Sequence, residues 1–300
     1  MGKDTNFPAA IRDYEIVSVT VAGELTSVKH LKHMNTRATV KKIDKNYYIV
    51  GDESSEVREC KHTNNRQESP KSVRKTLNKL CDVINTNSKD VKCCKWLTLT
   101  YSENMTDLKK LTRDWENMRK KMRRQWGDFK YIKVKEPQGR GAWHLHVLLI
   151  FEGTAPFMPV EDLQKAWGKG FVYIKSLKNN INNGLYFTMS LRDMKVSDAE
   201  EFGIEVDSSK LSKNKKYVKG ARLSLYKSVV HIFDCSEGIY SPEKKTMTKS
   251  EAYDFVKDKT QVDQYSKIIK DENGQVINVV SNIQYREKET YTTQIPNGYL

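Results

Sequence analysis

The sequence of 300 residues contains no apolar run of about 18 residues, the length that a helix needs to cross a bilayer. Its start, Met1 to Phe7, lacks the basic and then apolar order of a secretory signal. It has five cysteines, an odd number, and none forms the C-x-x-C pair that commonly holds zinc. These absences argue against a membrane protein, a disulfide scaffold and a zinc finger. We expect reduced packing cysteines and a protein that stays in the cytoplasm where it is made.

Acidic residues are also scarce relative to basic ones. The chain has 38 Asp and Glu against 52 Lys and Arg, a formal charge of +14. Such a charge points to a polyanionic partner, of which nucleic acid is the commonest. Half of the excess lies in residues 107–135, where eleven basic residues meet four acidic ones. This basic patch is either a nucleic-acid contact or an ordinary solvated helix face.

The hydrophobic periodicity predicts an α+β domain. Val73, Leu77, Leu80 and Ile84 fall at helical spacing. The segments that follow are predicted, in order, as strand 95–101, helix 108–126, strand 129–136, strand 143–151, helix 160–167 and strand 171–174. The β-α-β-β-α-β order is a ferredoxin-like plan with a central antiparallel sheet and flanking helices. Residues 185–191 fit a helix or a strand, and we favour a helix.

The two ends of the chain are less informative. Residues 1–60 predict short strands, including 16–21, and a hairpin turn before Tyr47. Residues 246–300 are charged and weakly patterned, with one hairpin signal at Asn273-Gly274. We therefore divide the chain into a β-rich flank (1–60), a catalytic domain (61–245) and a C-terminal extension (246–300).

Three residues of the predicted hairpin are candidate metal ligands. His144 and His146 are two residues apart in a strand, so their side chains share one face. Glu136 lies on the preceding strand, across the hairpin from them. Two imidazoles and one carboxylate with open positions suit a divalent Lewis acid, and a site that also holds phosphate favours Mg²⁺ or Mn²⁺ over Zn²⁺.

Two segments carry a resemblance to a known family. Trp96-Leu97-Thr98-Leu99-Thr100-Tyr101 resembles motif 1 of the HUH endonucleases, and His144-Leu145-His146 resembles their His-hydrophobic-His motif. The chain is most similar to the rolling-circle replication initiators of plasmids and filamentous-phage-like elements, over roughly residues 60–245. The resemblance implies an HUH endonuclease fold, a bacterial host, and nicking and rejoining of single-stranded origin DNA through a 5′-phosphotyrosine intermediate. A host helicase and polymerase would then be partners, because the chain has no G-x-x-x-x-G-K-[ST] motif of its own.

The resemblance implies Tyr186 as the nucleophile. Many relatives read Tyr-x-x-x-Tyr or Tyr-x-x-Lys here, whereas this chain has Met189 and Ser190 at the lysine and second tyrosine positions. The alternative is that Tyr186 only packs in the core. Exposed Tyr101 or Trp143 could stack on a splayed base, or be core aromatics instead. The candidate DNA contacts are Lys109, Lys110, Arg113, Arg119, Lys120, Arg123, Arg124, Arg140, Lys178 and Arg192, with Lys195 as a further phosphate contact.

Three other functions stay open at this point. A DNA-binding module with the same fold could bind without cutting, and retained binding without nicking would identify it. A relaxase or transposase would use the same fold and chemistry. A hydrolase of small phosphoesters is disfavoured, because a small substrate would not need the basic patch.

Overall fold

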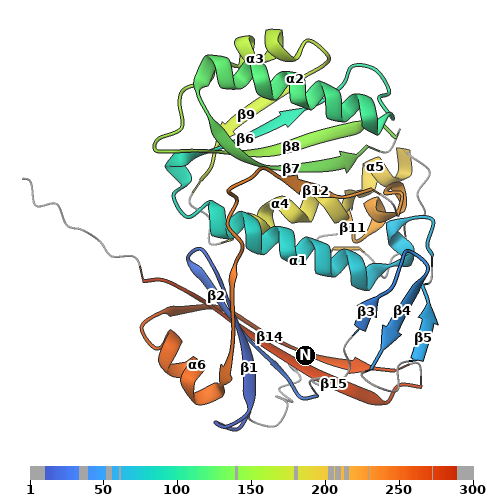
Figure 1. Cartoon of the computed structure of the whole chain (residues 1–300), viewed down its shortest axis with the longest axis vertical. Coiled ribbons are helices and arrows are strands. Elements are labelled where there is room, and N and C mark those ends of the chain that lie inside the picture. Colours follow the sequence, from blue (N-terminus) through green and yellow to red (C-terminus); the bar gives the residue numbers. More distant parts are fainter. Residues whose placement is uncertain are drawn as a thin grey trace, which may run out of the picture. The chain divides into compact units, whose positions relative to one another are not determined.

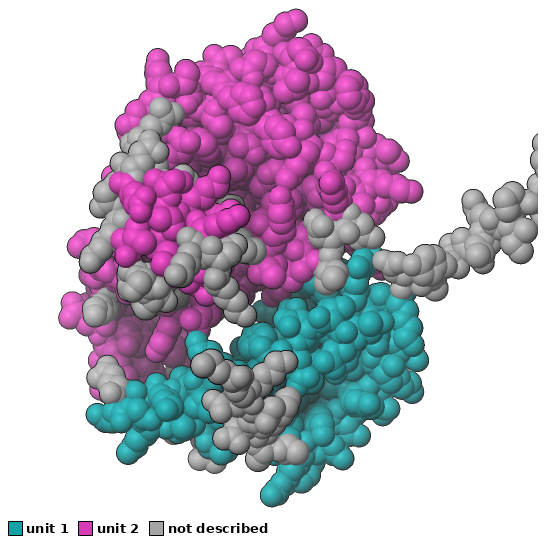
Figure 2. Space-filling view, turned by 180° about the vertical axis from the view of Figure 1, so that it is seen from behind, with its two compact units in different colours: residues 1–36, 242–300 teal, residues 37–241 magenta. Residues whose placement is uncertain are grey.

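The chain forms two compact units, which Figure 2 shows in different colours. Unit 1 consists of Met1–Thr36 and Pro242–Leu300, and unit 2 of Arg37–Ser241. The structure is a computed structural model, and it describes residues 11–33, 40–51, 56–60, 62–138, 141–178, 182–201, 206, 211–212, 216–228, 230–271 and 273–288. The sequence-based division at residues 60 and 245 treated the two ends separately, whereas unit 1 contains strands from both.

The centre of unit 2 is a five-stranded antiparallel sheet with the order β12-β7-β8-β6-β9 (Figure 1). Its strands are β6 (Cys94–Leu99), β7 (Phe129–Pro137), β8 (Trp143–Phe151), β9 (Val172–Ser176) and β12 (Phe233–Cys235). Helix α2 (Leu108–Trp126) connects β6 to β7, and α3 (Val160–Trp167) connects β8 to β9. Since β8 lies between β6 and β7, the sheet has the ferredoxin-like strand order. The predicted α+β class with a central antiparallel sheet is confirmed.

Helices α2 and α3 cover one face of this sheet. Asp107 caps α2 by accepting hydrogen bonds from two backbone N–H groups of its first turn. The ring of Trp115 on α2 meets Tyr131 of β7 edge-on, with 5.0 Å between ring centroids. Because side chains alternate between the faces of a strand, α2 lies on the face that carries the odd-numbered residues of β7. Lys121 of α2 donates to the carbonyl oxygen of Ala166, which joins α2 to α3.

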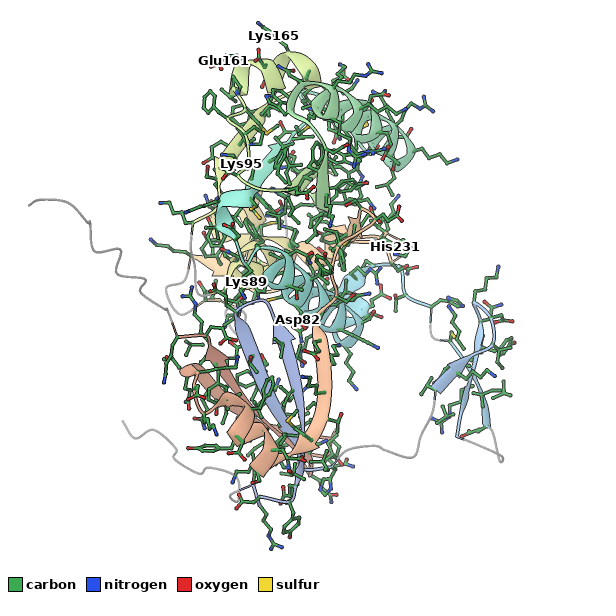
Figure 3. All side chains as sticks on the ribbon, turned by 60° about the vertical axis from the view of Figure 1, so that its left-hand side comes forward. Asp82, Lys89, Lys95, Glu161, Lys165 and His231 are labelled. Atoms are coloured by element: carbon green, nitrogen blue, oxygen red, sulfur yellow. The ribbon has the colours of Figure 1, made fainter. Side chains whose placement is uncertain are left out.

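Helices α1 (Pro70–Asn87) and α4 (Asn183–Arg192) cover the opposite face. Phe187 of α4 stacks on Trp96 of β6 with 3.7 Å between ring centroids. Figure 3 shows Asp82 on α1 and Lys165 on α3 on opposite sides of the strand that carries Lys95. The central sheet therefore separates two helical layers.

The predicted apolar side of α1 is confirmed, since Val73, Leu77, Leu80 and Ile84 are all buried. The contact between α1 and α4 is close enough to involve backbone. A Cβ atom on Gly184 would lie 2.2 Å from the carbonyl oxygen of Cys81, so only glycine fits there. The predicted helix at residues 185–191 is thus present as α4, and it is held against α1.

Unit 1 is a second antiparallel sheet, with the order β13-β1-β2-β15-β14. Its strands are β1 (Ile16–Ala22), β2 (Leu25–Leu31), β13 (Glu243–Thr248), β14 (Thr260–Lys270) and β15 (Val276–Arg286). Helix α6 (Lys249–Val256) starts at a capping box of Thr248 and Glu251 and buries Ala252 beside Val17 and Val19. The predicted hairpin at Asn273-Gly274 is confirmed as the turn between β14 and β15.

The remaining elements of unit 2 are short. They are β3 (Val40–Lys42), β4 (Tyr47–Val50), β5 (Glu56–Glu59), η1 (Arg66–Glu68), η2 (Val91–Cys93), β10 (Met194–Lys195), α5 (Val196–Glu201), β11 (Tyr217–Val218) and η4 (Ala221–Leu225). Strands β3, β4 and β5 form a small sheet of their own, and β10 pairs with β11. Among the described residues, no helix combines the length and the apolar character needed to cross a membrane.

Candidate functional site

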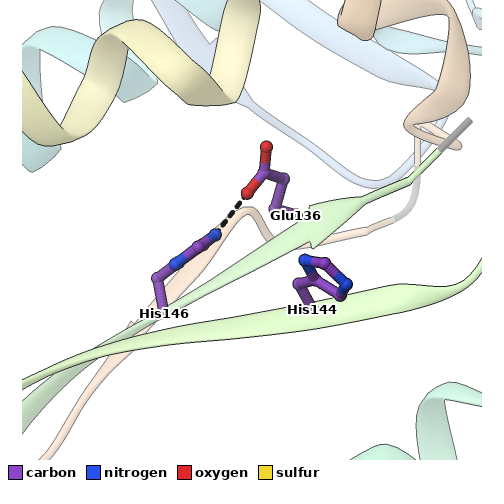
Figure 4. Close-up of side chains that lie close together, drawn as sticks. All are labelled: Glu136, His144 and His146. Atoms are coloured by element: carbon purple, nitrogen blue, oxygen red, sulfur yellow. Dashed lines mark hydrogen bonds and ion pairs between the residues drawn. The ribbon is translucent and has the colours of Figure 1, made fainter. Parts of the chain in front are cut away.

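The β7–β8 hairpin brings the three candidate metal ligands together (Figure 4). Glu136 pairs directly with His144, and Val134 pairs with His146, so the three polar side chains lie on one face. One ligand atom from each of Glu136, His144 and His146 lies within 4.8 Å of the other two. The sequence predicted this group on condition that the register agreed, and the register does agree.

The two ring nitrogens of His146 have different partners. Nε2 is hydrogen-bonded to a carboxylate oxygen of Glu136, and Nδ1 lies 3.1 Å from the hydroxyl oxygen of Thr98 on β6. A histidine that binds a metal through one nitrogen is typically oriented by a hydrogen bond at the other. Thr98 therefore holds the ring so that Nε2 points into the group.

Arg222 is a basic partner of the group. Its Nη1 lies 3.0 Å from the second carboxylate oxygen of Glu136 and 2.9 Å from the carbonyl oxygen of Pro137. Burial alone would raise the pKa of Glu136. The hydrogen bond from His146 and the charges of His146, Arg222 and His144 outweigh it and hold that pKa below its usual value. The carboxylate thus stays ionised, the form that a cation requires.

This donor set fits a divalent metal. Two imidazole nitrogens and one ionised carboxylate leave further coordination positions for water or substrate oxygens. Arg222 occupies one oxygen of Glu136, while the other oxygen faces His146. Thr98 and Arg222 therefore orient His146 and Glu136 before any metal arrives.

An aromatic stack connects the group to α4. The ring of Trp96 lies 5.6 Å from that of His146 and 3.7 Å from that of Phe187, nearly parallel to both. Tyr186, which precedes Phe187 on α4, is not parallel to the stack and is 55% exposed. Tyr186 is therefore not buried in the core, although its ring meets that of Phe187 edge-on.

Tyr186 lies beside a lysine in a hollow. The Nζ of Lys175 on β9 is 3.3 Å from the hydroxyl oxygen of Tyr186 and 5.0 Å from the centre of its ring. The hollow has a volume of about 360 Å³, and Lys178 also lines it. An ammonium group at this position can stabilise negative charge on the phenol oxygen.

Residues 94–190 match the family model of the replication-associated protein ORF2/G2P. No curated protein and no solved structure matches the chain. The match to the ORF2/G2P model runs from β6 through α4, so it includes Glu136, His144, His146 and Tyr186. It agrees with a DNA-replication role, and the geometry adds a group of side chains suited to a metal.

The predicted DNA-contact residues are distributed over both faces of the sheet. Those on α2 lie on the face opposite to Glu136, and the exposed ones are Lys109, Lys110, Arg113, Lys120 and Arg124. Two others on this helix have acidic partners, since Arg119 pairs with Glu116 and Arg123 lies 3.4 Å from Asp128. The sheet lies between α2 and the metal group, so contact of these residues with DNA stays a prediction.

The other predicted contacts lie outside α2. Lys178 lines the hollow at Tyr186, and Lys195 is exposed on β10. Arg140 lies outside the described residues, as does the side chain of Arg192.

The structure decides between the two roles considered for Tyr101 and Trp143. Both are buried in the core of unit 2. The hydroxyl of Tyr101 donates to Asp114, and the indole of Trp143 donates to the carbonyl oxygen of Thr106. These aromatics are therefore core residues and cannot stack on a base.

Sequence reasoning missed three residues of the site. Thr98 carries a usable signal, since it lies in the strand resembling motif 1 and alternation places it on the face of Trp96. Lys175 carries a similar signal, since it pairs with Trp96 in the sheet and alternation along β9 places it on the same face as Tyr173. Arg222 has no local signal, because it comes from η4, far along the chain from the hairpin.

Proposed function

We propose that the protein is a rolling-circle replication initiator that nicks and rejoins single-stranded DNA. Its metal would be Mg²⁺ or Mn²⁺ at Glu136, His144 and His146, and its nucleophile Tyr186. The observation that carries the proposal is the convergence of the two histidines and the glutamate within 4.8 Å in a segment that matches a replication-protein family. This chemistry is that of an HUH endonuclease.

We assign the following roles to these residues. A divalent ion held by the group would polarise the scissile phosphate as a Lewis acid. The hydroxyl oxygen of Tyr186 forms a bond to phosphorus, and the bond from phosphorus to the 3′ oxygen breaks. The phenolic proton leaves to water, the 3′ oxygen takes up a proton, and the Lys175 ammonium stabilises the phenol oxygen as its charge develops.

The products of this reaction explain why a host polymerase and a host helicase would be partners. The DNA keeps a free 3′-OH, which a host polymerase extends, while the 5′ end stays on Tyr186 until the reverse reaction rejoins it. A host helicase would separate the strands. The exposed cations of α2, on the other face of the sheet, raise the local concentration of DNA through long-range attraction.

A nicking experiment tests this proposal. Single-stranded DNA with the origin of the element that encodes the protein, and a random-sequence pool, are labelled at either the 5′ or the 3′ end and incubated with Mn²⁺ or Mg²⁺. We expect a protein-linked band only with the 3′ label, because the 3′ fragment carries the phosphotyrosine. Tyr186→Phe and His146→Ala should abolish the band.

Tyr240→Phe is a matched control, because Tyr240 is an exposed tyrosine whose ring packs against Lys130 and phenylalanine preserves that ring. Cleavage that survives Tyr186→Phe would show that another group is the nucleophile. Binding of DNA without cleavage in either metal would refute the proposed reaction.

A non-catalytic DNA-binding module is the second candidate. Glu136 is already paired with His146 and Arg222, and the chain has Met189 and Ser190 where relatives have a lysine and a second tyrosine. If this candidate is correct, the wild type and His146→Ala will bind single-stranded DNA equally, and neither will form a covalent product.

A further inference from the structure

Two exposed aromatic side chains lie at the free edge of the central sheet. Strand β9 is the last strand on one side of this sheet. Phe171 and Tyr173 are 64% and 48% exposed, whereas Val172 between them is only 1% exposed. The alternation from Phe171 into β9 buries one face and leaves the two large rings exposed on the other.

These rings lie on the same face of the sheet as the metal group. Thr98 of β6 pairs with His146 on one side and with Tyr173 on the other. The row from His146 through Thr98 to Tyr173 crosses three adjacent strands, a span of about 10 Å. Phe171 continues the face beside Thr100, with which it exchanges backbone and side-chain hydrogen bonds.

The strip between the metal group and the edge is partly open. Thr98, Thr100 and the two histidines are half-buried. One end of the strip is closed by Phe187 of α4, which stacks on Trp96. The exposed face of β9 beyond Tyr173 therefore continues the surface that begins at the metal group.

The charge beside this strip is positive. Lys175 comes two residues after Tyr173 on the same face of β9, and the hollow that these two residues line with Tyr186 also includes Lys178. Two ammonium groups next to exposed rings match the two chemical parts of a single nucleic-acid strand, its phosphates and its unpaired bases. Paired bases in a duplex would not offer their faces to such rings.

We propose that Phe171 and Tyr173 form a stacking platform for the bases of single-stranded DNA next to the scissile phosphate. The platform rests on the proposed function, since it names how the substrate of that site is held. Lys175 and Lys178 contact the phosphates of the same nucleotides. The platform selects single strands without reading their sequence, because every base has a face that can stack.

Binding without metal tests the platform separately from catalysis. Fluorescence anisotropy is measured with a labelled oligothymidine, an abasic strand of the same length and a duplex, in a Tyr186→Phe background that cannot nick. We expect Phe171→Ala and Tyr173→Ala each to weaken oligothymidine binding by about tenfold. The double variant should bind oligothymidine and the abasic strand equally, whereas the unsubstituted protein should prefer the former.

Two further variants control for folding and for exposed aromatics in general. Tyr173→Trp keeps a stacking ring and should retain binding. Phe157→Ala removes a ring that is 84% exposed and does not belong to the platform, so it should change nothing. Unchanged oligothymidine affinity in the double variant would overturn the platform, as would an equal loss for the abasic strand. If the double variant loses its preference for oligothymidine and the wild type does not nick DNA in the nicking experiment, the platform is upheld and the proposed reaction is rejected.

Discussion

The hydrogen bond between Thr98 and His146 should set the metal affinity of the group. Thr98→Val replaces the hydroxyl by a methyl group of similar size in a strand that valine favours, so the fold should persist. Without the hydroxyl, Nδ1 of His146 loses the partner that lies 3.1 Å away. The ring can then rotate or adopt the tautomer that carries its proton on Nε2, which cannot bind a metal.

The expected size of the effect follows from this geometry. Removing the partner of a metal-binding histidine typically lowers affinity by about 10- to 100-fold, which corresponds to about 1.4–2.8 kcal/mol. Most of the lost metal affinity should come from the lost orientation of the His146 ring, because one neutral hydrogen bond contributes only about 1 kcal/mol. The affinity for Mn²⁺ is measured by isothermal titration calorimetry on protein from which metals have been removed.

Two variants make the measurement decisive. Thr98→Ser keeps the hydroxyl and should recover most of the affinity, while Thr20→Val makes the same replacement in β1 of unit 1 and should have no effect. Equal Mn²⁺ affinity in Thr98→Val and the wild type would refute the argument. So would a loss in Thr98→Ser as large as that in Thr98→Val.

Three other predictions concern stability and reactivity. Gly184→Ala should lower the free energy of unfolding by about 1–3 kcal/mol or more in chemical denaturation, because the new methyl group would collide with the backbone of Cys81; a stability equal to that of the wild type would contradict the close α1–α4 contact. The thiols of Cys81 and Cys94, whose pKa values burial raises to about 12, should resist iodoacetamide in the native protein and react after unfolding, as peptide mass spectrometry can show. In metal-free protein, the lowered pKa of Glu136 contributes stability above the unfolded-state pKa that is lost as the pH falls through the folded-state value. The difference in melting temperature between wild type and Glu136→Gln should therefore shrink in acid, and a constant difference would exclude this linkage.

The sequence predicted those features that depend on local patterns. The two-residue repeat in β8 fixed the shared face of His144 and His146, and the three- and four-residue spacing identified α1 and α2. The antiparallel hairpin placed Glu136 opposite the histidines once the strand lengths were known. These patterns were sufficient because each involves neighbours along the chain.

Features that depend on distant contacts could not be predicted in this way. The period of α2 shows which side of the helix is buried, but not which face of the sheet it covers. The aromatic side chains of Tyr101 and Trp143 suit either base stacking or core packing. Only the tertiary structure shows that both are buried. Arg222 reaches Glu136 from a segment far along the chain, for which the local sequence gives no indication.

Unit 1 is built from two segments that are far apart in the sequence, and this affects how the chain folds during synthesis. Strands β1 and β2 leave the ribosome early, yet their sheet neighbours β13 and β15 are made only after all of unit 2. At about 5–20 residues per second, the early strands wait on the order of tens of seconds with unpaired edges. Unit 2 has all of its strands by then, so it can fold first. Chaperone dependence and aggregation during translation should therefore originate in the N-terminal hairpin and not in the part of the chain that carries the metal ligands.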